Sequence, residues 1–397
     1  MPAHLTDLFR RYIAWTSDDP LGLVIDRAEG PFIFTSDGRR IIDFISGIAV
    51  SSLGHGHPAV LEVIHRQVDR HLHVMVYGEM IQRPQVELAA LLASRLPPQL
   101  QVTYFTNSGT EANEGALKLA KKATGRHRII AFEGSFHGDT HGALSVTGRD
   151  VYRRPFEPLL PGIEFLPFND TAALSAIDMD TACVITEPIQ GEGGINVPQD
   201  SWMQALRQAC DKTGALLIFD EVQTGMGRTG TLFAFEQFGV VPDVLTLAKA
   251  FGGGMPLGAF ISSGAHMSAL RSDPPLSHVT TFGGHPVSCA AAHAALSVII
   301  SENLPARANE LGRRIRERLR GPGIVEVRGR GAMLGLLLQD ASLTARVVKR
   351  CLDAGVLLGW TLHSDRLIRI APHLNIDWEV LDFACEVIKD SVAQEQR

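Results

Sequence analysis

Two ionisable side chains stand at the ends of apolar runs where buried strands are expected. Lys249 closes the run VLTLAK shortly before three glycines, and Asp220 closes the run ALLIFD. An amine that is desolvated at the end of a strand has a lowered pKa and can act as a nucleophile. A single lysine at such a place more often reaches back to solvent. The residues at the neighbouring strand ends must therefore decide between the two interpretations.

Other predicted strands also end in residues that suit a small ligand. After VTYFT, Ser108, Gly109 and Thr110 open a helix whose free N–H groups can bind a phosphate. Ser108 or Thr110 can equally be an ordinary helix cap. After RIIAF comes Phe136, which can stack on a planar ring or belong to the core. Glu187 follows the run TACVIT.

Together these residue types match the requirements of pyridoxal phosphate (PLP). Its aldehyde needs a lysine, its ring nitrogen needs an acid, and its phosphate needs a cluster of donors. Two further sets stand at suitable places, Val222 and Gln223 after Asp220, and Thr280 and Thr281 before two glycines. Each residue alone is weak evidence, but the complete set predicts a PLP site.

Two other kinds of site are excluded by spacing. The segments GTEANEG and GMGRTG lack the strand and the later acidic residue that complete a dinucleotide-binding motif. His137, Asp139 and His141 lie close together but lack further metal ligands at suitable spacing. We therefore expect no metal site.

The composition is that of an ordinary globular protein. The 397 residues are 45% hydrophobic, and the net charge of −6 contains no long run of like charge, so neither a nucleic acid nor a membrane is expected as a partner. Five scattered cysteines and the absence of a signal peptide predict a cytoplasmic location. The apolar segment 287–300 is too short to span a bilayer and predicts a buried helix.

Alternation of apolar strands and helical segments predicts an α/β fold with a wound, largely parallel sheet over residues 57–300. Residues 301–397 predict a small α+β domain. Residues 1–56 contain a hairpin that turns at Asp37-Gly38, and we expect this segment to join the small domain.

The motifs NSGTEAN, FHG, EPIQGEGG, FDEVQTGMGRTG, LAKAFGGGMPLGA and TTFGGHP run through most of the chain. In this order they resemble the class III PLP-dependent aminotransferases of fold type I. The nearest subgroup is that of the acetylornithine and ornithine aminotransferases. The resemblance implies a large PLP-binding domain, a small domain and a homodimer with shared active sites.

The resemblance also implies a role for each residue of the predicted PLP site. Lys249 would hold PLP as a Schiff base and later move a proton, while Asp220 would pair with the pyridinium nitrogen. The ring would lie between Phe136 and Val222. The other contacts would come from Ser108, Gly109, Thr110, Glu187 and Gln223, with Thr280 and Thr281 of each subunit serving the site of the other.

Four further residues are implied to contact the substrate. Arg369 would bind a substrate carboxylate, and Glu192 would pair with this arginine while an ω-amino donor is bound. Tyr77 would line the pocket, or be a core aromatic. Asp139 stands where the subgroup has an arginine for the distal carboxylate. It would repel that group, accept a cationic end, or pair with Arg369.

The resulting hypothesis is a PLP-dependent aminotransferase with ping-pong chemistry. The donor would be an ω-amine, such as an ornithine-like or acetylornithine-like compound or a diamine. The acceptor would be a 2-oxo acid, with 2-oxoglutarate expected. Two alternatives remain: a class III racemase or aminomutase, which needs no acceptor, and a PLP-binding protein without catalysis.

Overall fold

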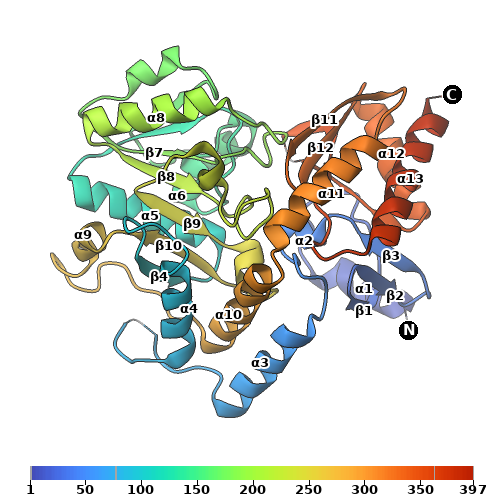
Figure 1. The fold of residues 1–397 in the computed structure, drawn as a ribbon, viewed down its shortest axis with the longest axis horizontal. Coiled ribbons are helices and arrows are strands. Elements are labelled where there is room, and N and C mark those ends of the chain that lie inside the picture. The colour runs from blue at the N-terminus through green and yellow to red at the C-terminus, as the bar shows by residue number, and fades with distance from the viewer. Residues whose placement is uncertain (1, 77, 362, 397) are drawn as a thin grey trace.

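A seven-stranded sheet occupies the middle of the chain in the computed structural model, which describes residues 2–76, 78–361 and 363–396 (Figure 1). Strands β5 to β9 run parallel to one another, whereas β10 runs antiparallel to both β9 and β4. This confirms the predicted wound, mostly parallel sheet. In spatial order the strands are β4 (Val102–Thr106), β10 (Gly258–Ser262), β9 (Val244–Leu247), β8 (Leu216–Asp220), β7 (Thr181–Thr186), β5 (Arg128–Phe132) and β6 (Ile163–Leu166).

Helices cover both faces of this sheet. Helix α5 (Gly109–Thr124) packs on one face, where Ile218 of β8 belongs to its core. Leu217 and Phe219 of the same strand point the other way, into the core that includes α8 (Asp200–Thr213). Because successive residues of a strand alternate between two buried faces, the strand is apolar throughout.

Helix α10 (Pro286–Ser301) is the predicted buried, alanine-rich helix, and it packs against α3 (Pro58–Arg70) and α4 (Arg83–Ala93). Among the described residues, no single helix is long and apolar enough to cross a membrane. Helices α10 and α11 (Leu304–Arg318) reach the length and apolar composition of a membrane span only when they are taken together, and they meet at a bend of 68°.

Two smaller sheets lie to the right of the large sheet in Figure 1. The first is antiparallel and is accompanied by α11, α12 (Ala341–Asp353) and α13 (Trp378–Glu395). Its strands, in spatial order, are β11 (Ile324–Arg330), β12 (Met333–Leu338), β15 (Ser364–Ile370) and β14 (Gly359–Thr361).

The second small sheet joins the two ends of the chain. Its strands are β1 (Ile25–Glu29), β2 (Phe32–Thr35), β3 (Arg40–Asp43) and β13 (Val356–Leu357). Strands β2 and β3 form the expected hairpin, and Gly38 in its turn has a φ of 86°. Strand β3 pairs in parallel with β13, so the N-terminal hairpin lies beside the C-terminal part of the chain. The division at residues 56/57 and 300/301 stays a prediction.

The remaining elements are short. They are α1 (Pro2–Tyr12), α2 (Ser46–Ala49), α6 (His141–Ser145), α7 (Asp150–Arg153), α9 (Gly264–Met267), and the 3₁₀ turns η1 (Arg154–Phe156), η2 (Ala172–Ala176), η3 (Ala234–Phe238), η4 (Lys249–Gly252) and η5 (Ser268–Leu270).

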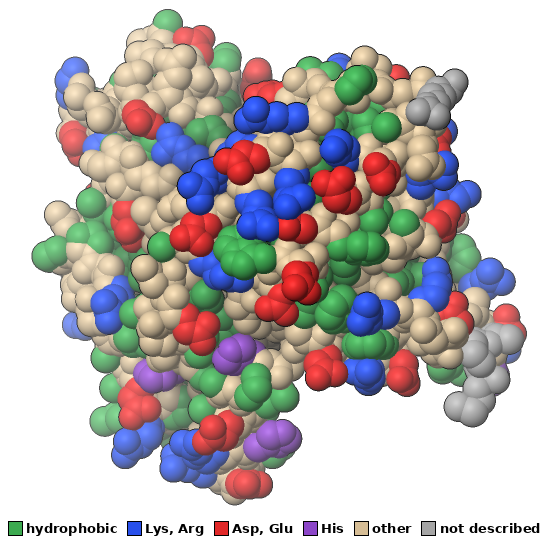
Figure 2. All heavy atoms as spheres, turned by 45° about the vertical axis from the view of Figure 1, so that its right-hand side comes forward, with side chains coloured by type: hydrophobic (Ala, Val, Ile, Leu, Met, Phe, Trp, Pro, Cys, Tyr) green, Lys and Arg blue, Asp and Glu red, His purple; other side chains and the backbone are tan. Residues whose placement is uncertain are grey.

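Charged side chains of both signs are interspersed on the face of the molecule shown in Figure 2. Ion pairs also join helices of the C-terminal part of the chain. Arg314 and Arg318 of α11, for example, both pair with Asp382 of α13.

The two carboxylates at the end of β8 have separate environments. Asp220 lines a cavity, which is described below, whereas Glu221 is buried behind it. The Glu221 carboxylate accepts hydrogen bonds from the N–H groups of Ala234 (2.6 Å) and Phe235 (2.8 Å) and from the hydroxyl of Thr224 (3.2 Å). Burial nevertheless raises the pKa of Glu221 to about 7.

We predict that Glu221→Gln changes how stability depends on pH. Because the folded-state pKa of about 7 lies above the unfolded value of 4.5, this carboxyl stabilises the fold most at low pH, and this contribution is lost as the pH rises to 7. The loss amounts to about 3 kcal/mol at most. Thermal unfolding should show the variant gaining stability relative to the parent protein between about pH 5 and pH 8. If the stability of the variant and that of the parent protein change in parallel with pH, the raised pKa of Glu221 is contradicted.

Candidate active site

One cavity of about 430 Å³ opens at the carboxyl edge of the large sheet. This volume lies within the range of small-molecule pockets, which is about 300–1,000 Å³. Carboxyl ends of parallel strands are where wound sheets bind ligands. Ten of the residues predicted for the site line this cavity, namely Ser108, Gly109, Thr110, Phe136, Glu187, Glu192, Asp220, Val222, Gln223 and Lys249.

Lys249 leaves the end of β9 in an unusual backbone conformation. It starts η4 with a φ of 49°, in the left-handed region that side chains other than glycine seldom adopt. Its side chain faces the cavity, and desolvation by the surrounding protein lowers the pKa of its amine. The negative charge of Glu192 opposes this shift in part. More of the amine is therefore neutral at a given pH than in water.

The Asp220 carboxylate is held by donors from three elements. One oxygen accepts from Asn113 Nδ2 of α5 and is in contact with His137 Nδ1, both at 2.8 Å. The other oxygen accepts from the N–H of Val222 at 3.0 Å. The Thr246 hydroxyl donates to Asn113 Oδ1 at 2.8 Å, which fixes the amide with its N–H groups toward Asp220. The carboxylate is thereby aimed at the cavity.

Glu187 connects two loops that line the cavity. One carboxylate oxygen accepts from the N–H of Phe136 (3.1 Å) and the other from the N–H of Gly191 (2.7 Å). Burial raises the pKa of Glu187 to about 7, against the opposing effect of His137. The side chain therefore positions the predicted ring-stacking Phe136 relative to the loop that carries Glu192.

The start of α5 can bind a phosphate through its backbone. The Ser108 hydroxyl caps the helix by accepting from the N–H of Glu111 (3.3 Å), and the Thr110 hydroxyl bonds to that of Thr140 (2.7 Å). Because the first N–H groups of a helix have no partner within it, those near Gly109 remain for an anion. A side chain at Gly109 would place Cβ 2.9 Å from both methyl groups of Val222.

These residues fit PLP, the cofactor that the sequence resemblance implies. The cavity combines an amine of lowered pKa, a fixed carboxylate and a helix start. Among the described residues, the buried Gln223 Oε1 and His137 Nε2 atoms have no hydrogen-bond partner. Gln223 lines the cavity, and its side-chain N–H groups can donate to a ring oxygen of the cofactor.

A buried ion pair joins the cavity to the small antiparallel sheet. Arg369 of β15 donates through Nη2 to Glu192 Oε1, and the two side chains are 6% and 8% exposed. Glu192 lines the cavity, so the guanidinium is held beside it by a carboxylate. The structure thus brings together the two residues for which sequence predicted an exchangeable pair.

Besides Arg369, which is held beside the cavity by Glu192, three predicted site residues of the described chain do not line it, namely Asp139, Thr280 and Thr281. Thr281 and Asp139 are exposed, the latter one residue beyond Gly138 of the cavity wall. Thr280 accepts from Asn107 Nδ2 at 3.1 Å, and its predicted role, like that of Thr281, is in the other subunit of a dimer. Tyr77 lies outside the described residues. The roles of Asp139, Thr280, Thr281 and Tyr77 stay predictions.

Two residues that contact Asp220 were not predicted from the sequence. Asn113 follows Gly109 by one helical turn, so both face the sheet, and this spacing is a signal that could have been used. His137 was considered only as a metal ligand, whereas its ring contacts Asp220. The apolar wall from Met255 and Leu257 was also not predicted.

Comparison with known proteins gives consistent results. Residues 12–392 match the family Aminotransferase class-III. An acetylornithine aminotransferase from Methanopyrus kandleri is 48% identical over 317 residues, which cover 79% of this chain and 80% of the relative. A putrescine aminotransferase from Pectobacterium atrosepticum is 40% identical, and the match covers 94% of this chain and 84% of the relative. A solved ornithine aminotransferase from Toxoplasma gondii, with PLP in partial occupancy, superposes with a TM-score of 0.92 at 30% identity, covering 100% of this chain and 95% of its own.

We predict that Gly109→Ala weakens cofactor binding by about tenfold or more, because the new methyl group must displace Val222 from the cavity wall. Gly264→Ala is a matched control. Gly264 also begins a helix after a serine cap, but a Cβ there would meet its nearest atom at 3.8 Å. Titration of both variants with PLP, followed by absorbance, measures the effect. Equal affinities would contradict it.

Proposed function

This chain belongs to the class III aminotransferases, PLP-dependent transferases of fold type I, and we propose that it moves an amino group from an ω-amine to a 2-oxo acid such as 2-oxoglutarate. The observation that carries this proposal is the buried pair between Arg369 and Glu192. Among the described residues, no unpaired guanidinium then lines the cavity, so a carboxylate beside the reacting carbon has no ready partner.

An ω-amine suits this arrangement because its reacting carbon carries no carboxylate. Such a donor can bind while the pair stays closed. A 2-oxo acid brings a carboxylate of its own, which would take the place of Glu192 on Arg369 in a bidentate pair. One cavity can thereby accept both partners of a ping-pong reaction.

This chain differs from its subgroup at the residue predicted to contact the non-reacting end of the donor. Asp139 stands at the position where acetylornithine and ornithine aminotransferases have an arginine, and it is exposed next to the cavity residue Gly138. A carboxylate there favours a donor with a cationic end, such as a diamine or ornithine, over one with only a carboxylate. The relatives include a putrescine aminotransferase, as well as acetylornithine aminotransferases.

Each residue of the cavity has a separate role in the proposed reaction. Bound PLP supplies a carbonyl group for the substrate amine and a ring that accepts electrons. Asp220 keeps a proton on the ring nitrogen, and its three donors keep it in place. The Lys249 amine would hold the cofactor and then move a proton from the donor carbon that bears the reacting amine. Met255 and Leu257 form an apolar part of the cavity wall.

The working unit would be a homodimer in the cytoplasm. In such a dimer, Thr280 and Thr281 of one subunit would complete the phosphate site of the other. All five cysteines are unpaired and buried, a state that suits a reducing compartment.

The proposal is tested by half-reactions in the absence of acceptor. Putrescine, ornithine and N-acetylornithine are each mixed with the protein, and the cofactor absorbance is followed. We expect at least one ω-amine to bleach it and 2-oxoglutarate to restore it, with no change in Lys249→Ala. Turnover without any 2-oxo acid would indicate the racemase or aminomutase instead. Failure of every amine would contradict the proposed function.

Asp139→Arg tests whether Asp139 selects donors by the charge of their non-reacting end. The substitution should shift the preference toward N-acetylornithine over putrescine by up to about fivefold, the size expected for an exposed charge. The ratio of the two kcat/KM values measures this shift. An unchanged ratio would contradict a role of Asp139 in donor selection.

Glu192→Gln tests the ion-pair exchange. The variant leaves Arg369 without its anionic partner, so we expect KM for 2-oxoglutarate to fall and KM for the ω-amine to rise, each by about tenfold. Steady-state kinetics with both substrates varied will measure this. If both KM values change in the same direction, Glu192 has another role.

A further inference from the structure

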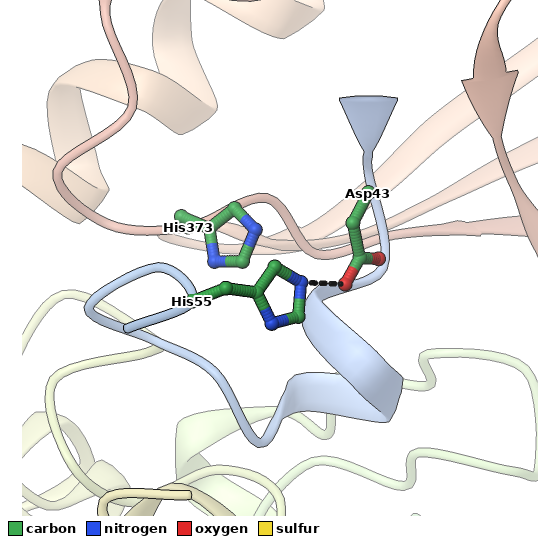
Figure 3. Close-up of side chains that lie close together, drawn as sticks. All are labelled: Asp43, His55 and His373. Carbon is green, nitrogen blue, oxygen red and sulfur yellow. Dashed lines mark hydrogen bonds and ion pairs between the residues drawn. The ribbon is translucent and has the colours of Figure 1, made fainter. Parts of the chain in front are cut away.

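A second group of ionisable side chains lies away from Lys249, where the two small sheets meet. Asp43 ends β3, His55 follows α2, and His373 follows β15. One side-chain ligand atom from each of the three lies within 4.8 Å of the others. Figure 3 shows the two imidazole rings side by side, with the Asp43 carboxylate facing them.

The tautomer of His373 leaves one nitrogen available. Its Nδ1 donates to the carbonyl oxygen of Ser51, so Nε2 carries the lone pair. His373 is 0% exposed, and its Nε2 has no partner among the described residues. In Figure 3 the Nε2 edge of the ring is turned toward Asp43. A buried acceptor without a donor costs free energy, which a ligand at this place would recover.

Asp43 is equally well positioned. It is 1% exposed, and its carboxylate accepts from the N–H groups of Ile45 (3.2 Å) and Gly47 (2.9 Å). The same oxygen that accepts from Gly47 lies 3.0 Å from His55 Nε2. The edge of a tetrahedron around zinc, with bonds of about 2.0 Å, is about 3.3 Å. Small movements would therefore bring both atoms to ligand distances.

Hydrogen bonds to the backbone orient the ligands, as is usual around metal sites. The Ser51 carbonyl fixes the ring of His373, and the loop 45–47 fixes the carboxylate. Two imidazoles and one carboxylate are a set of three protein ligands that leaves a fourth position open.

Of the three proposed ligands, His55 lies nearest to solvent. The His55 side chain is 20% exposed and lines a cavity of about 290 Å³. Close to the cluster, the buried Arg228 donates to the carbonyl of Pro372 (2.5 Å) and to the hydroxyl of Ser52 (3.0 Å). Its positive charge offsets that of Asp43, so a dication here needs an anionic fourth ligand.

We propose that Asp43, His55 and His373 bind one zinc-like divalent cation, with a solvent-derived hydroxide as the fourth ligand. The protein ligands are Oδ2 of Asp43 and the Nε2 atoms of both histidines. When the cation binds, the Nε2 proton of His55 moves to Nδ1 or to solvent. The cation would fasten the N-terminal hairpin to the loop after β15.

The experiment uses the PLP-loaded protein after removal of metals with a chelator. Zn²⁺ is titrated in competition with a chromophoric chelator, and Co²⁺ is added to record the visible absorption of a tetrahedral site. We expect one ion per chain and a loss of affinity of roughly 100-fold or more in His373→Gln. Binding that is equal in His373→Gln and the parent protein would overturn the proposal, as would the absence of binding.

Two further variants separate a lost ligand from a lost fold. His55→Gln removes a partly exposed ligand and should also weaken binding strongly. His363→Gln is the matched control, because His363 also has Nδ1 bonded to a carbonyl (Gly134, 3.1 Å) and a buried Nε2 without a partner among the described residues. It should bind Zn²⁺ like the parent protein. Equal weakening in all three variants would overturn the assignment of these ligands.

Discussion

A carboxylate at the buried end of a strand is the constraint on which the proposed site depends. An isolated charge at Asp220 would cost several kcal/mol, so donors must surround it. They come from the side chains of Asn113 and His137 and from the backbone of Val222. Because these residues belong to α5, to the loop after β5 and to the chain after β8, satisfying one charge fixes three elements around the cavity.

The same fixed elements carry the residues that would contact the cofactor. Holding Asn113 also fixes the start of α5, where Gly109 lies against Val222. Holding His137 fixes the loop of Phe136, and Glu187 then ties that loop to the N–H of Gly191. The cavity is thus built by polar contacts between loops, on a sheet whose stability comes from its two apolar faces.

Much of this fold could be predicted from sequence, because apolar runs that end in polar residues identify strands buried on both faces. Lys249 and Asp220 could be located because parallel strands share one carboxyl edge. The hydroxyls of Ser108 and Thr110 could not be assigned, since a helix cap and a phosphate contact require the same residue types. Asp43 and His373 are more than 300 residues apart, and only the three-dimensional fold, in which β3 pairs with β13, places them together.

The pair between Glu192 and Arg369 limits how the cavity can change between its two substrates. Removing one partner from a buried ion pair costs about 3–5 kcal/mol, so Arg369 cannot stay unpaired for long. In the proposed exchange, Glu192 leaves only when a substrate carboxylate replaces it, and the number of paired charges stays constant. By that exchange, one cavity could bind an ω-amine and a 2-oxo acid in turn. In the proposed function, selection of the donor would then depend on its non-reacting end, for which Asp139 is the predicted contact.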